Sequence, residues 1–349
     1  MRTEVFVALL VVLFIAAVLL VLLCYLLARK HADNRLARQL EQLIEEARPA
    51  MFAYLIHGKT SGFLDAGGSP VQIRALEMLL DSCADVMSGE EATRRITSYA
   101  ESTFTAAYRA NLFSRQWSIR MNTLYRIERF GMTGLAPELV KLLERDSDVS
   151  AAELAQICKT LAGWGDEALL RRLKNRPPAL PEFQRRLILS RMSDGLFTLF
   201  MQERVSYPRD WQLAAVDIVG ILRKLEHADT LQELLGHEEA EFRIRALKAL
   251  CELPVSVDGD GLLRHAESAD WQERAMAARL FGRIRYAGFL PSLQAMLSDG
   301  SWYVRSQAAQ SICAFPDGQP LLRRIADHSS DRFARDMAAE WAERGLENG

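Results

Sequence analysis

The chain has 349 residues, of which 49% are hydrophobic and 25% are charged. This composition is that of a folded protein and excludes a largely disordered one, and the length suits two domains or one extended array. The formal net charge is −2, and residues 49–349 carry 37 basic and 40 acidic residues. Because dedicated nucleic-acid binders show a strong basic excess, this balance argues against a nucleic-acid partner.

The first predicted element is a membrane-spanning helix. Residues 5–27 contain no charged side chain, and as a helix they extend over roughly 35 Å, enough to cross a bilayer. A cleaved signal peptide has a shorter apolar region of about 7–15 residues that ends in small residues, whereas this region ends in Tyr25-Leu26-Leu27. We therefore expect residues 1–28 to form an uncleaved anchor with a short amino-terminal flank.

The charges beside the anchor predict its orientation. Before it, Arg2 is offset by Glu4. The basic residues that follow it are Arg29, Lys30, Arg35 and Arg38. Because positive flanks stay in the cytoplasm, we expect a single-pass protein of a bacterial inner membrane with a cytoplasmic body. Five scattered cysteines without a C-x-x-C pair agree with a reducing compartment and predict buried thiols rather than disulfides.

The next two segments are predicted to be helical. Residues 29–57 form a juxtamembrane amphipathic segment that we expect to break near Pro49, either as a stalk or as the first helix packed on the body. Residues 58–113 include two further helical stretches, 71–87 and 90–113, which suit a cap or divergent leading repeats.

A repeat of about 30 residues fills the rest of the chain, residues 114–349. It is clearest in "DWQERAMAARLF" (270–281) and "SWYVRSQAAQSI" (301–312), where an arginine precedes a pair of alanines. The anchor positions of the eight copies are Arg120, Ala152, Arg186, Ala214, Arg245, Arg274, Arg305 and Arg335. The residues four positions earlier, most of which suit a helix start, are Gln116, Asp148, Glu182, Asp210, Glu241, Asp270, Ser301 and Asp331.

Each copy reads as a helix, a turn and a second helix. A large apolar residue stands between the cap and the anchor, and small residues follow the anchor. We expect the small residues to let neighbouring first helices approach and the large ones to fill the seams. The second stretches are 136–146, 165–175, 228–237, 288–299 and 318–328. Since no unit can bury both its faces alone, the units are predicted to stack into an all-α solenoid.

This pattern resembles the HEAT-repeat family, particularly its short bacterial form, over about residues 114–345. The resemblance is weakest for the unit at 182–208, and it implies a concave face lined by the second helices. Other HEAT-like proteins are DNA-repair glycosylases with a basic groove, or attach bilins to light-harvesting proteins. The neutral charge balance argues against the first of these activities, and a membrane anchor is not expected for the second.

The arginines themselves are predicted to be structural. Arg305 is expected to pair with Asp331 or Asp270, as one step of a ladder along the solenoid that fixes register. The members of this ladder are Arg120, Arg186, Arg245, Arg274, Arg305, Arg335, Asp270 and Asp331.

Motifs for catalysis are missing from the sequence. There is no P-loop, G-x-G-x-x-G, G-x-S-x-G or H-E-x-x-H motif, and the six histidines never pair at i+3 or i+4. We therefore expect no catalytic residue, metal or cofactor. Two basic clusters on second helices are candidates for partner binding, with a solvated helix face as the alternative. Their residues are Arg171, Arg172, Lys174, Arg176, Arg323 and Arg324.

Together these features predict a non-catalytic, membrane-tethered scaffold or adaptor for membrane-associated proteins, in a setting such as an envelope polysaccharide or secretion assembly. The alternative is a lyase or chaperone that acts on a small molecule or modified peptide in the concave groove.

Overall fold

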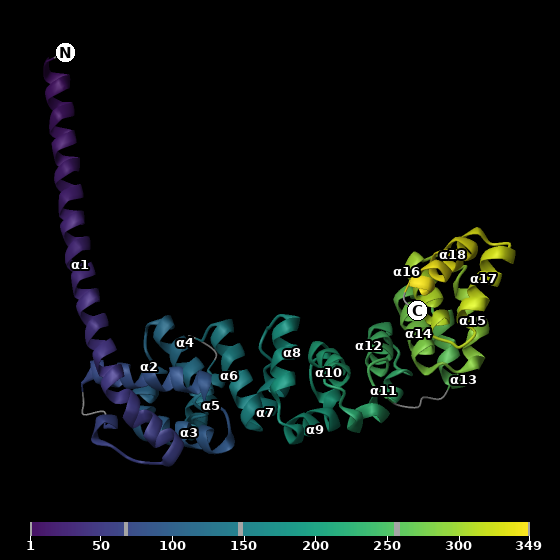
Figure 1. Cartoon of the computed structure of the whole chain (residues 1–349), viewed down its shortest axis with the longest axis horizontal. Coiled ribbons are helices and arrows are strands. Elements are labelled where there is room, and N and C mark those ends of the chain that lie inside the picture. The colour runs from purple at the N-terminus through teal and green to yellow at the C-terminus, as the bar shows by residue number, and fades with distance from the viewer. Residues whose placement is uncertain (1, 66–68, 146–148, 255–258, 348–349) are drawn as a thin grey trace. The chain divides into compact units, whose positions relative to one another are not determined.

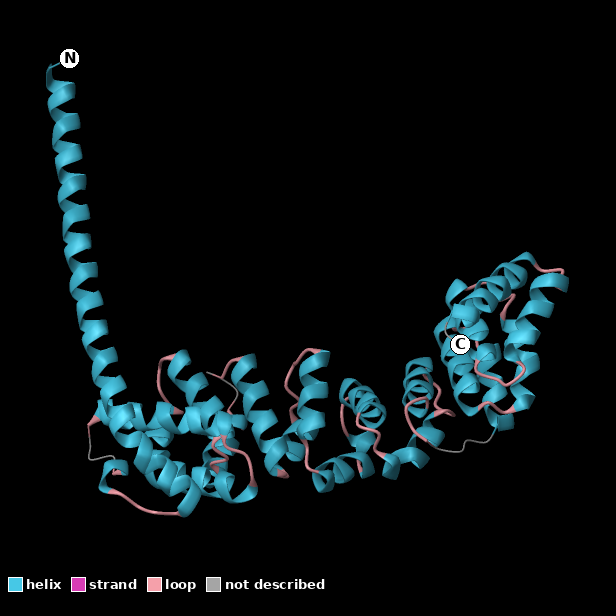
Figure 2. Ribbon diagram, viewed as in Figure 1, coloured by secondary structure: helices cyan, strands magenta, loops and turns pink. Residues whose placement is uncertain are grey.

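The computed structural model describes residues 2–65, 69–145, 149–254 and 259–347, and the side chains of residues 13–344 within these ranges except Asp260. Every element assigned in these residues is a helix, so the predicted all-α class is confirmed (Figure 2). The chain forms two compact units, which we call unit 1 (Met1–Leu142) and unit 2 (Leu143–Gly349).

Unit 1 begins with one long helix, α1 (Arg2–His57). The expected break near Pro49 is wrong, because α1 continues through this residue. Side chains on both sides of the proline, such as Ala47 and Met51, are buried where α1 packs on α2 and α3, and this packing holds the helix together despite the missing N–H. The second half of α1 is therefore the first helix of the body rather than a free stalk.

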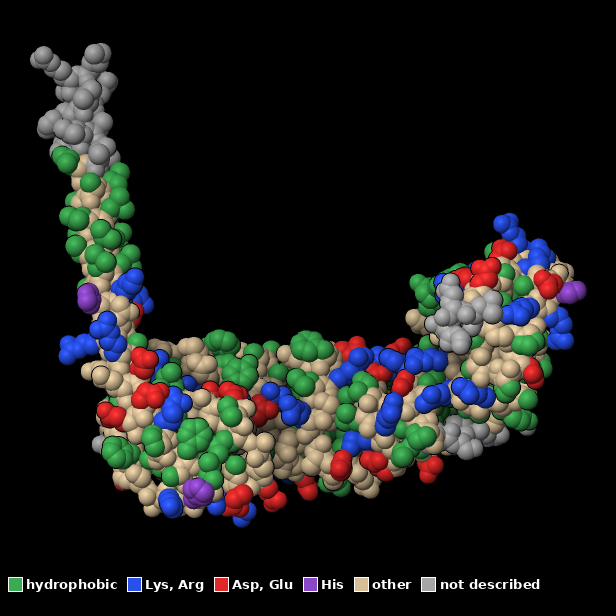
Figure 3. All heavy atoms as spheres, in the orientation of Figure 1, with side chains coloured by type: hydrophobic (Ala, Val, Ile, Leu, Met, Phe, Trp, Pro, Cys, Tyr) green, Lys and Arg blue, Asp and Glu red, His purple; other side chains and the backbone are tan. Residues whose placement is uncertain are grey.

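The first half of α1 is different, because its apolar side chains are exposed from Leu13 to Leu27. By length and composition this helix could cross a membrane. Figure 3 shows the same contrast, with hydrophobic side chains covering the described part of the free helix.

The remaining helices of unit 1 pack around buried aromatic rings, including Phe104, Tyr108 and Phe130. Their bounds are η1 (Gly62–Leu64), α2 (Pro70–Val86), α3 (Glu90–Asn111), α4 (Trp117–Arg129), η2 (Thr133–Leu135) and α5 (Ala136–Leu143), whose last residue belongs to unit 2. Helices α2 and α3 match the two stretches that the sequence predicts at 71–87 and 90–113.

Unit 2 is a series of helix pairs. The first helices of the pairs are α6 (Ala151–Trp164), α8 (Glu182–Arg191), α10 (Arg209–Ile221), α12 (Ala240–Leu250), α14 (Trp271–Ile284), α16 (Trp302–Cys313) and α18 (Arg332–Glu347). The second helices are α7 (Ala168–Asn175), α9 (Asp194–Gln202), α11 (Ala228–Leu234), α13 (Gly259–Leu262), α15 (Leu290–Met296) and α17 (Gly318–His328). Short 3-10 turns are η3 (Arg204–Ser206), η4 (Leu225–His227), η5 (Leu263–Glu267) and η6 (Ala287–Phe289).

Consecutive first helices lie side by side, from α6 to α18 (Figure 1). Small residues form these contacts, as the sequence predicts. Ala277 and Ala308 are fully buried, and Gly220 lies so close to α12 that an added Cβ would stand 2.7 Å from Ala249 Cα. The helical solenoid is therefore confirmed, including the helix pair α8–α9 in the segment where the resemblance is weakest.

The large residues near the helix starts depart from their predicted role. Trp211 and Phe242 are buried, but Trp271, Trp302 and Phe333 are exposed. The difference follows from position: the buried two are the third residues of their helices, whereas the exposed three are first or second residues. Because successive residues are about 100° apart around a helix, a shift of one or two positions moves a side chain from the seam to the surface.

Candidate functional site

The arginines of the repeat brace the loop that precedes each first helix. Arg274 Nη1 donates to the carbonyl oxygens of Ser268 and Ala269, at 2.7 and 3.2 Å. The same two upstream carbonyls, six and five residues back, accept from Arg120, Arg243, Arg305 and Arg335. Each of these arginines is the fourth residue of its helix.

Two members of the predicted ladder stand in a different register. The fourth residues of α8 and α12 are Arg185 and Arg243, whereas the anchors predicted from the repeat are Arg186 and Arg245. Arg185 donates to the Leu180 carbonyl, five residues upstream. The loop-bracing positions 243, 274, 305 and 335 are therefore spaced by 31, 31 and 30 residues.

Arg186 and Arg245 instead surround a buried carboxylate on the helix between them, which we call the Asp217 cluster. Asp217 on α10 accepts from Arg245 at 2.5 Å and lies 2.9 Å from Arg186. Arg245 also pairs with Glu182 at 2.9 Å and with Glu241 at 2.6 Å. The cluster links α8, α10 and α12, and its positive charges are matched by carboxylates.

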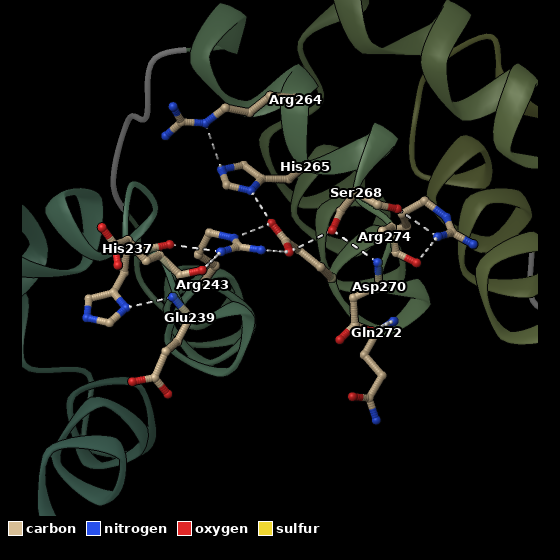
Figure 4. Close-up of polar contacts among 12 residues, drawn as sticks. His237, Glu239, Arg243, Arg264, His265, Ser268, Asp270, Gln272 and Arg274 are labelled. Carbon is tan, nitrogen blue, oxygen red and sulfur yellow. Dashed lines mark hydrogen bonds and ion pairs between the residues drawn. The ribbon is translucent and has the colours of Figure 1, made fainter. Parts of the chain in front are cut away.

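A second network joins α12 to α14 (Figure 4). Arg243 donates through Nε and Nη2 to the two carboxylate oxygens of Glu273, at 2.9 and 2.7 Å. The same carboxylate accepts from His265 Nδ1 at 2.7 Å and from the Ser268 hydroxyl at 2.8 Å. One repeat later, Arg274 pairs with Asp299 at 2.7 and 2.8 Å. Arginine–carboxylate pairs thus connect successive repeats, but with partners other than those the sequence indicates.

The charges of this network are fixed by its hydrogen bonds. Burial of the Glu273 carboxyl raises its pKa, but hydrogen bonds from Arg243, His265 and Ser268 outweigh this effect and lower the pKa to about 2. Burial lowers the pKa of His265, and Arg264 Nε lies 3.4 Å from His265 Nε2, which can accept only when unprotonated. His265 and Glu273 are both 2% exposed, so this contact lies inside unit 2.

The predicted partners of Arg305 have other roles. Arg305 donates to the carbonyls of Asp299 and Gly300, and its guanidinium lies 4.6 Å from the ring centre of Phe333. Asp270 and Asp331 cap their helices, accepting from the amides of Gln272 and Ala334 at 2.8 Å. The predicted cap Asp148 lies outside the described residues, and Ser150 caps α6 in a capping box with Glu153.

The two basic clusters lie on separate second helices. On α7, Arg172 Nε donates to the Leu143 carbonyl at 2.8 Å and Lys174 pairs with Glu203, so both are engaged in the fold, while Arg171 is exposed. Arg176 follows α7 and is also exposed. On α17, Arg323 and Arg324 are both exposed.

Arg324 lines a groove between α15, α17 and the start of α18, with a volume of about 450 Å³. The other residues of the groove are Gln294, Ser298, Leu321, Ile325, His328, Ser329 and Ala334. Within the described residues, no group of three or more His, Cys, Asp or Glu side chains is placed to hold a metal ion.

A row of exposed rings runs along the starts of α14, α16 and α18. We call it the aromatic edge; its residues are Trp271, Trp302, Tyr303 and Phe333, which are 40%, 53%, 60% and 57% exposed. Tyr303 stacks on Trp271 with ring centres 5.0 Å apart and meets Trp302 edge-on at 5.4 Å. The repeat pattern predicts that these rings fill the seams between helices. Their position at the first or second residue of a helix is the signal that they are exposed.

Residues 259–342 match a family model for HEAT repeats. Sequence comparison with curated proteins finds no match. Among solved structures, the chain is similar to an engineered protein at 15% identity over 89% of both chains, with a TM-score of 0.39.

Two natural proteins are also similar in structure. One is human deoxyhypusine hydroxylase in complex with glycerol, at 16% identity over 88% of this chain and 99% of that one, with a TM-score of 0.28. The other is the complex of CpcE and CpcF of phycocyanin lyase from Nostoc sp. PCC7120, at 15% identity over 69% and 94%, with a TM-score of 0.31. Likenesses this distant carry no conclusion about activity.

Proposed function

The C-terminal part of the chain, residues 259–342, belongs to the HEAT-repeat family, and from this premise we propose that the protein is a non-catalytic, membrane-tethered scaffold for other proteins. Arrays of stacked helical repeats present extended surfaces that bind partners through many contacts. In this proposal helix α1 attaches the array to a bacterial inner membrane. The basic residues that follow its apolar half favour a cytoplasmic unit 2.

The aromatic edge is the observation that carries this proposal. Trp, Tyr and Arg are the residue types enriched in the energetic centres of protein interfaces. Two adjacent repeats present Trp271 on α14 and Trp302 and Tyr303 on α16, the helix that also carries Arg305. The rings already contact one another, so little side-chain freedom remains to be lost when a partner covers them. Tethering then raises the local concentration of membrane-associated partners around this surface.

The test is cross-linking of the full-length protein in its native membranes, followed by mass spectrometry. We expect a membrane-associated protein to cross-link to the wild type and to be lost from the double variant Trp271→Ala/Trp302→Ala. The matched control is Phe63→Ala, which removes a ring that is 62% exposed in unit 1. Equal recovery with all three proteins, or none with the wild type, contradicts the proposal.

A second candidate function is the binding of a small molecule or modified peptide in the α15–α17 groove, as in a lyase or chaperone. The volume of about 450 Å³ lies in the range of ligand pockets. Arg324 and His328 supply polar groups beside the apolar Leu321, Ile325 and Ala334. This function predicts a chromophore or other small molecule that co-purifies with the full-length protein and is lost from Arg324→Ala. An absorbance spectrum without a chromophore band, together with no small molecule in the mass spectrum, argues against it.

A further inference from the structure

A second arginine-rich region of unit 2 lies at the C-terminal ends of the first helices. We call it the arginine pocket; it has a volume of about 390 Å³, and its charged lining residues are Arg223, Glu252, Arg279, Arg283 and Arg285. The lining residues come from the turns that follow α10 and α12, and from α14, α16 and the turns after them. Figure 3 shows lysine and arginine side chains gathered on the visible face of unit 2 in the region from α10 to α14.

The charges of the arginine pocket are unbalanced. Its four arginines face a single acidic residue, Glu252, which leaves a local charge of +3. Glu252 pairs with Arg279 at 2.8 Å. Within the described parts of the chain, Arg223, Arg283 and Arg285 have no ion-pair partner, and all three are exposed. Three guanidinium groups are therefore available to an anion from outside the chain.

The pocket offers polar groups but no reactive thiol. Burial raises the pKa of Cys251 to about 12, so this side chain stays a neutral thiol. Gln307, Gln310 and Ser311 add amide and hydroxyl groups that can hydrogen-bond a peptide backbone. The lining thus suits binding of an extended anionic group.

The backbone conformation at Arg223 and Arg285 is a second, independent observation that points to a role for these two side chains. Arg223 and Arg285 have φ of 53° and 57°, the left-handed conformation in which Cβ crowds the backbone of every residue except glycine. At the ends of α4 and α6 the same conformation is adopted by Gly131 and Gly165, with φ of 64° and 73°. Attraction to the negative end of a helix explains a cation near its last turn, but not one in place of glycine.

The spacing of Arg223 and Arg285 also matches the repeat. Arg223 and Arg285 are 62 residues apart, which equals two repeats of 31, and both line one pocket. This is the signal in the sequence that could have revealed the pocket, together with the basic run around Arg283.

We propose that the arginine pocket binds an acidic segment of the partner protein, with carboxylates facing Arg223, Arg283 and Arg285. This inference rests on the proposed scaffold function and names the chemistry of its partner. An extended peptide fits better than a small anion because the arginines are exposed and belong to two repeats, those of α10 and α14. Each exposed pair contributes little, so binding requires several carboxylates carried on one chain.

The experiment measures fluorescence anisotropy of a labelled decaglutamate peptide with the full-length protein in neutral detergent micelles. We expect binding that weakens as salt rises, and no binding of a labelled decaglutamine peptide. The double variant Arg223→Gly/Arg285→Gly should weaken binding about tenfold, since it removes two charge pairs. The control variant Arg74→Gln/Arg191→Gln removes the same charge at two exposed positions outside the pocket and should bind as the wild type does.

Three results overturn this proposal. They are equal binding of the two peptides, equal affinity of the pocket variant and the wild type, and Arg223- and Arg285-dependent binding of pyrophosphate or phosphatidylglycerol vesicles that exceeds binding of decaglutamate. The last result assigns the pocket to a phosphate group or a lipid surface. The two proposals can fail separately. If Trp271→Ala/Trp302→Ala loses the partner cross-link but the peptide does not bind, the scaffold function stands and only the arginine-pocket proposal fails. If the peptide binds but the wild type cross-links to no partner, the scaffold function fails.

Discussion

The Asp217 cluster and the arginine pocket use the same residue type in opposite ways. In the Asp217 cluster, Arg186 and Arg245 share a buried carboxylate, and their charges are neutralised within unit 2. In the arginine pocket, Arg223 and Arg285 are exposed and stand in a backbone conformation that suits glycine. Pairing marks the first group as structural, while unpaired charge and backbone strain mark the second as a binding surface.

The comparison also separates what each group does for stability. A buried carboxylate between two guanidinium groups becomes costly when any one member is lost, because a charge is then left without its partner in a partly dry site. Exposed arginines can be removed at little cost to the fold. Substitutions in the two arginine regions should therefore change the free energy of unfolding by different amounts and in opposite directions.

The largest effect is expected at the Asp217 cluster. Asp217→Ala leaves Arg186 and Arg245 without their shared carboxylate and should lower the free energy of unfolding by about 3 kcal/mol, the low end for a broken buried pair because Arg186 is one-third exposed. Urea unfolding of the full-length protein, followed by circular dichroism, measures the change. Asp327→Ala, at an exposed position of α17, is the control and should change the midpoint little. A similar midpoint for both variants would mean that the cluster is dispensable.

The second-largest effect is expected from acid, which should weaken the α12–α14 network. The folded-state pKa of Glu273 lies at about 2, below its ordinary value of 4.5, so the contribution of its carboxylate is present above pH 4.5 and is lost as pH falls through 2. The pKa of His265 is also lowered, and the contribution of its neutral ring is lost as pH falls below 6.5. We expect an acid loss on the order of 2 kcal/mol in the wild type. The variant Glu273→Gln should be less stable at pH 7 and show a flatter decline below pH 4.5; an unchanged decline contradicts this assignment.

Both arginine regions depend on the close approach of α10 and α12, which Gly220 permits. Gly220→Ala places Cβ 2.7 Å from Ala249 Cα, so the two helices must separate, at a cost of about 1–2 kcal/mol. Thermal unfolding measures the loss. Gly195→Ala, also within a helix but with open space around it, is the matched control and should raise stability slightly. If Gly220→Ala is as stable as Gly195→Ala, this helix contact is looser than the distance implies.

The sequence was sufficient to predict the solenoid because its signals are local. Repeated small residues such as Ala277 and Ala308 and breaks between helices recur at a nearly constant spacing, and they place both helices of most repeats. The surface was harder to predict, because a shift of one residue separates the loop-bracing Arg185 from Arg186 of the Asp217 cluster. Likewise, two helical positions separate the exposed Trp271 from the buried Trp211. The partners of Arg305 and the left-handed backbone at Arg223 depend on tertiary geometry, which spacing alone does not encode.

The smallest predicted effect is a gain in stability, and it distinguishes the two arginine regions most clearly. Arg223→Gly and Arg285→Gly should each raise the free energy of unfolding by about 1 kcal/mol, since glycine adopts their φ of 53° and 57° without crowding. For a unit of this size, such a gain raises the unfolding midpoint by about 2–4 °C. Arg279→Gly is the matched control: it removes an arginine from the same pocket, but inside helix α14, and should lower stability by about 1 kcal/mol.

The combination of this gain with weaker peptide binding is what distinguishes the two arginine regions. If a residue contributes to the fold, its replacement by glycine should lower stability. If it serves to bind a ligand, the glycine variant can be more stable than the wild type. If Arg223→Gly and Arg285→Gly instead destabilise the chain as Arg279→Gly does, their side chains contribute to packing, and the arginine pocket becomes a second structural network like the Asp217 cluster. If they stabilise it and the decaglutamate peptide binds more weakly, the strained backbone at these two positions is maintained by binding.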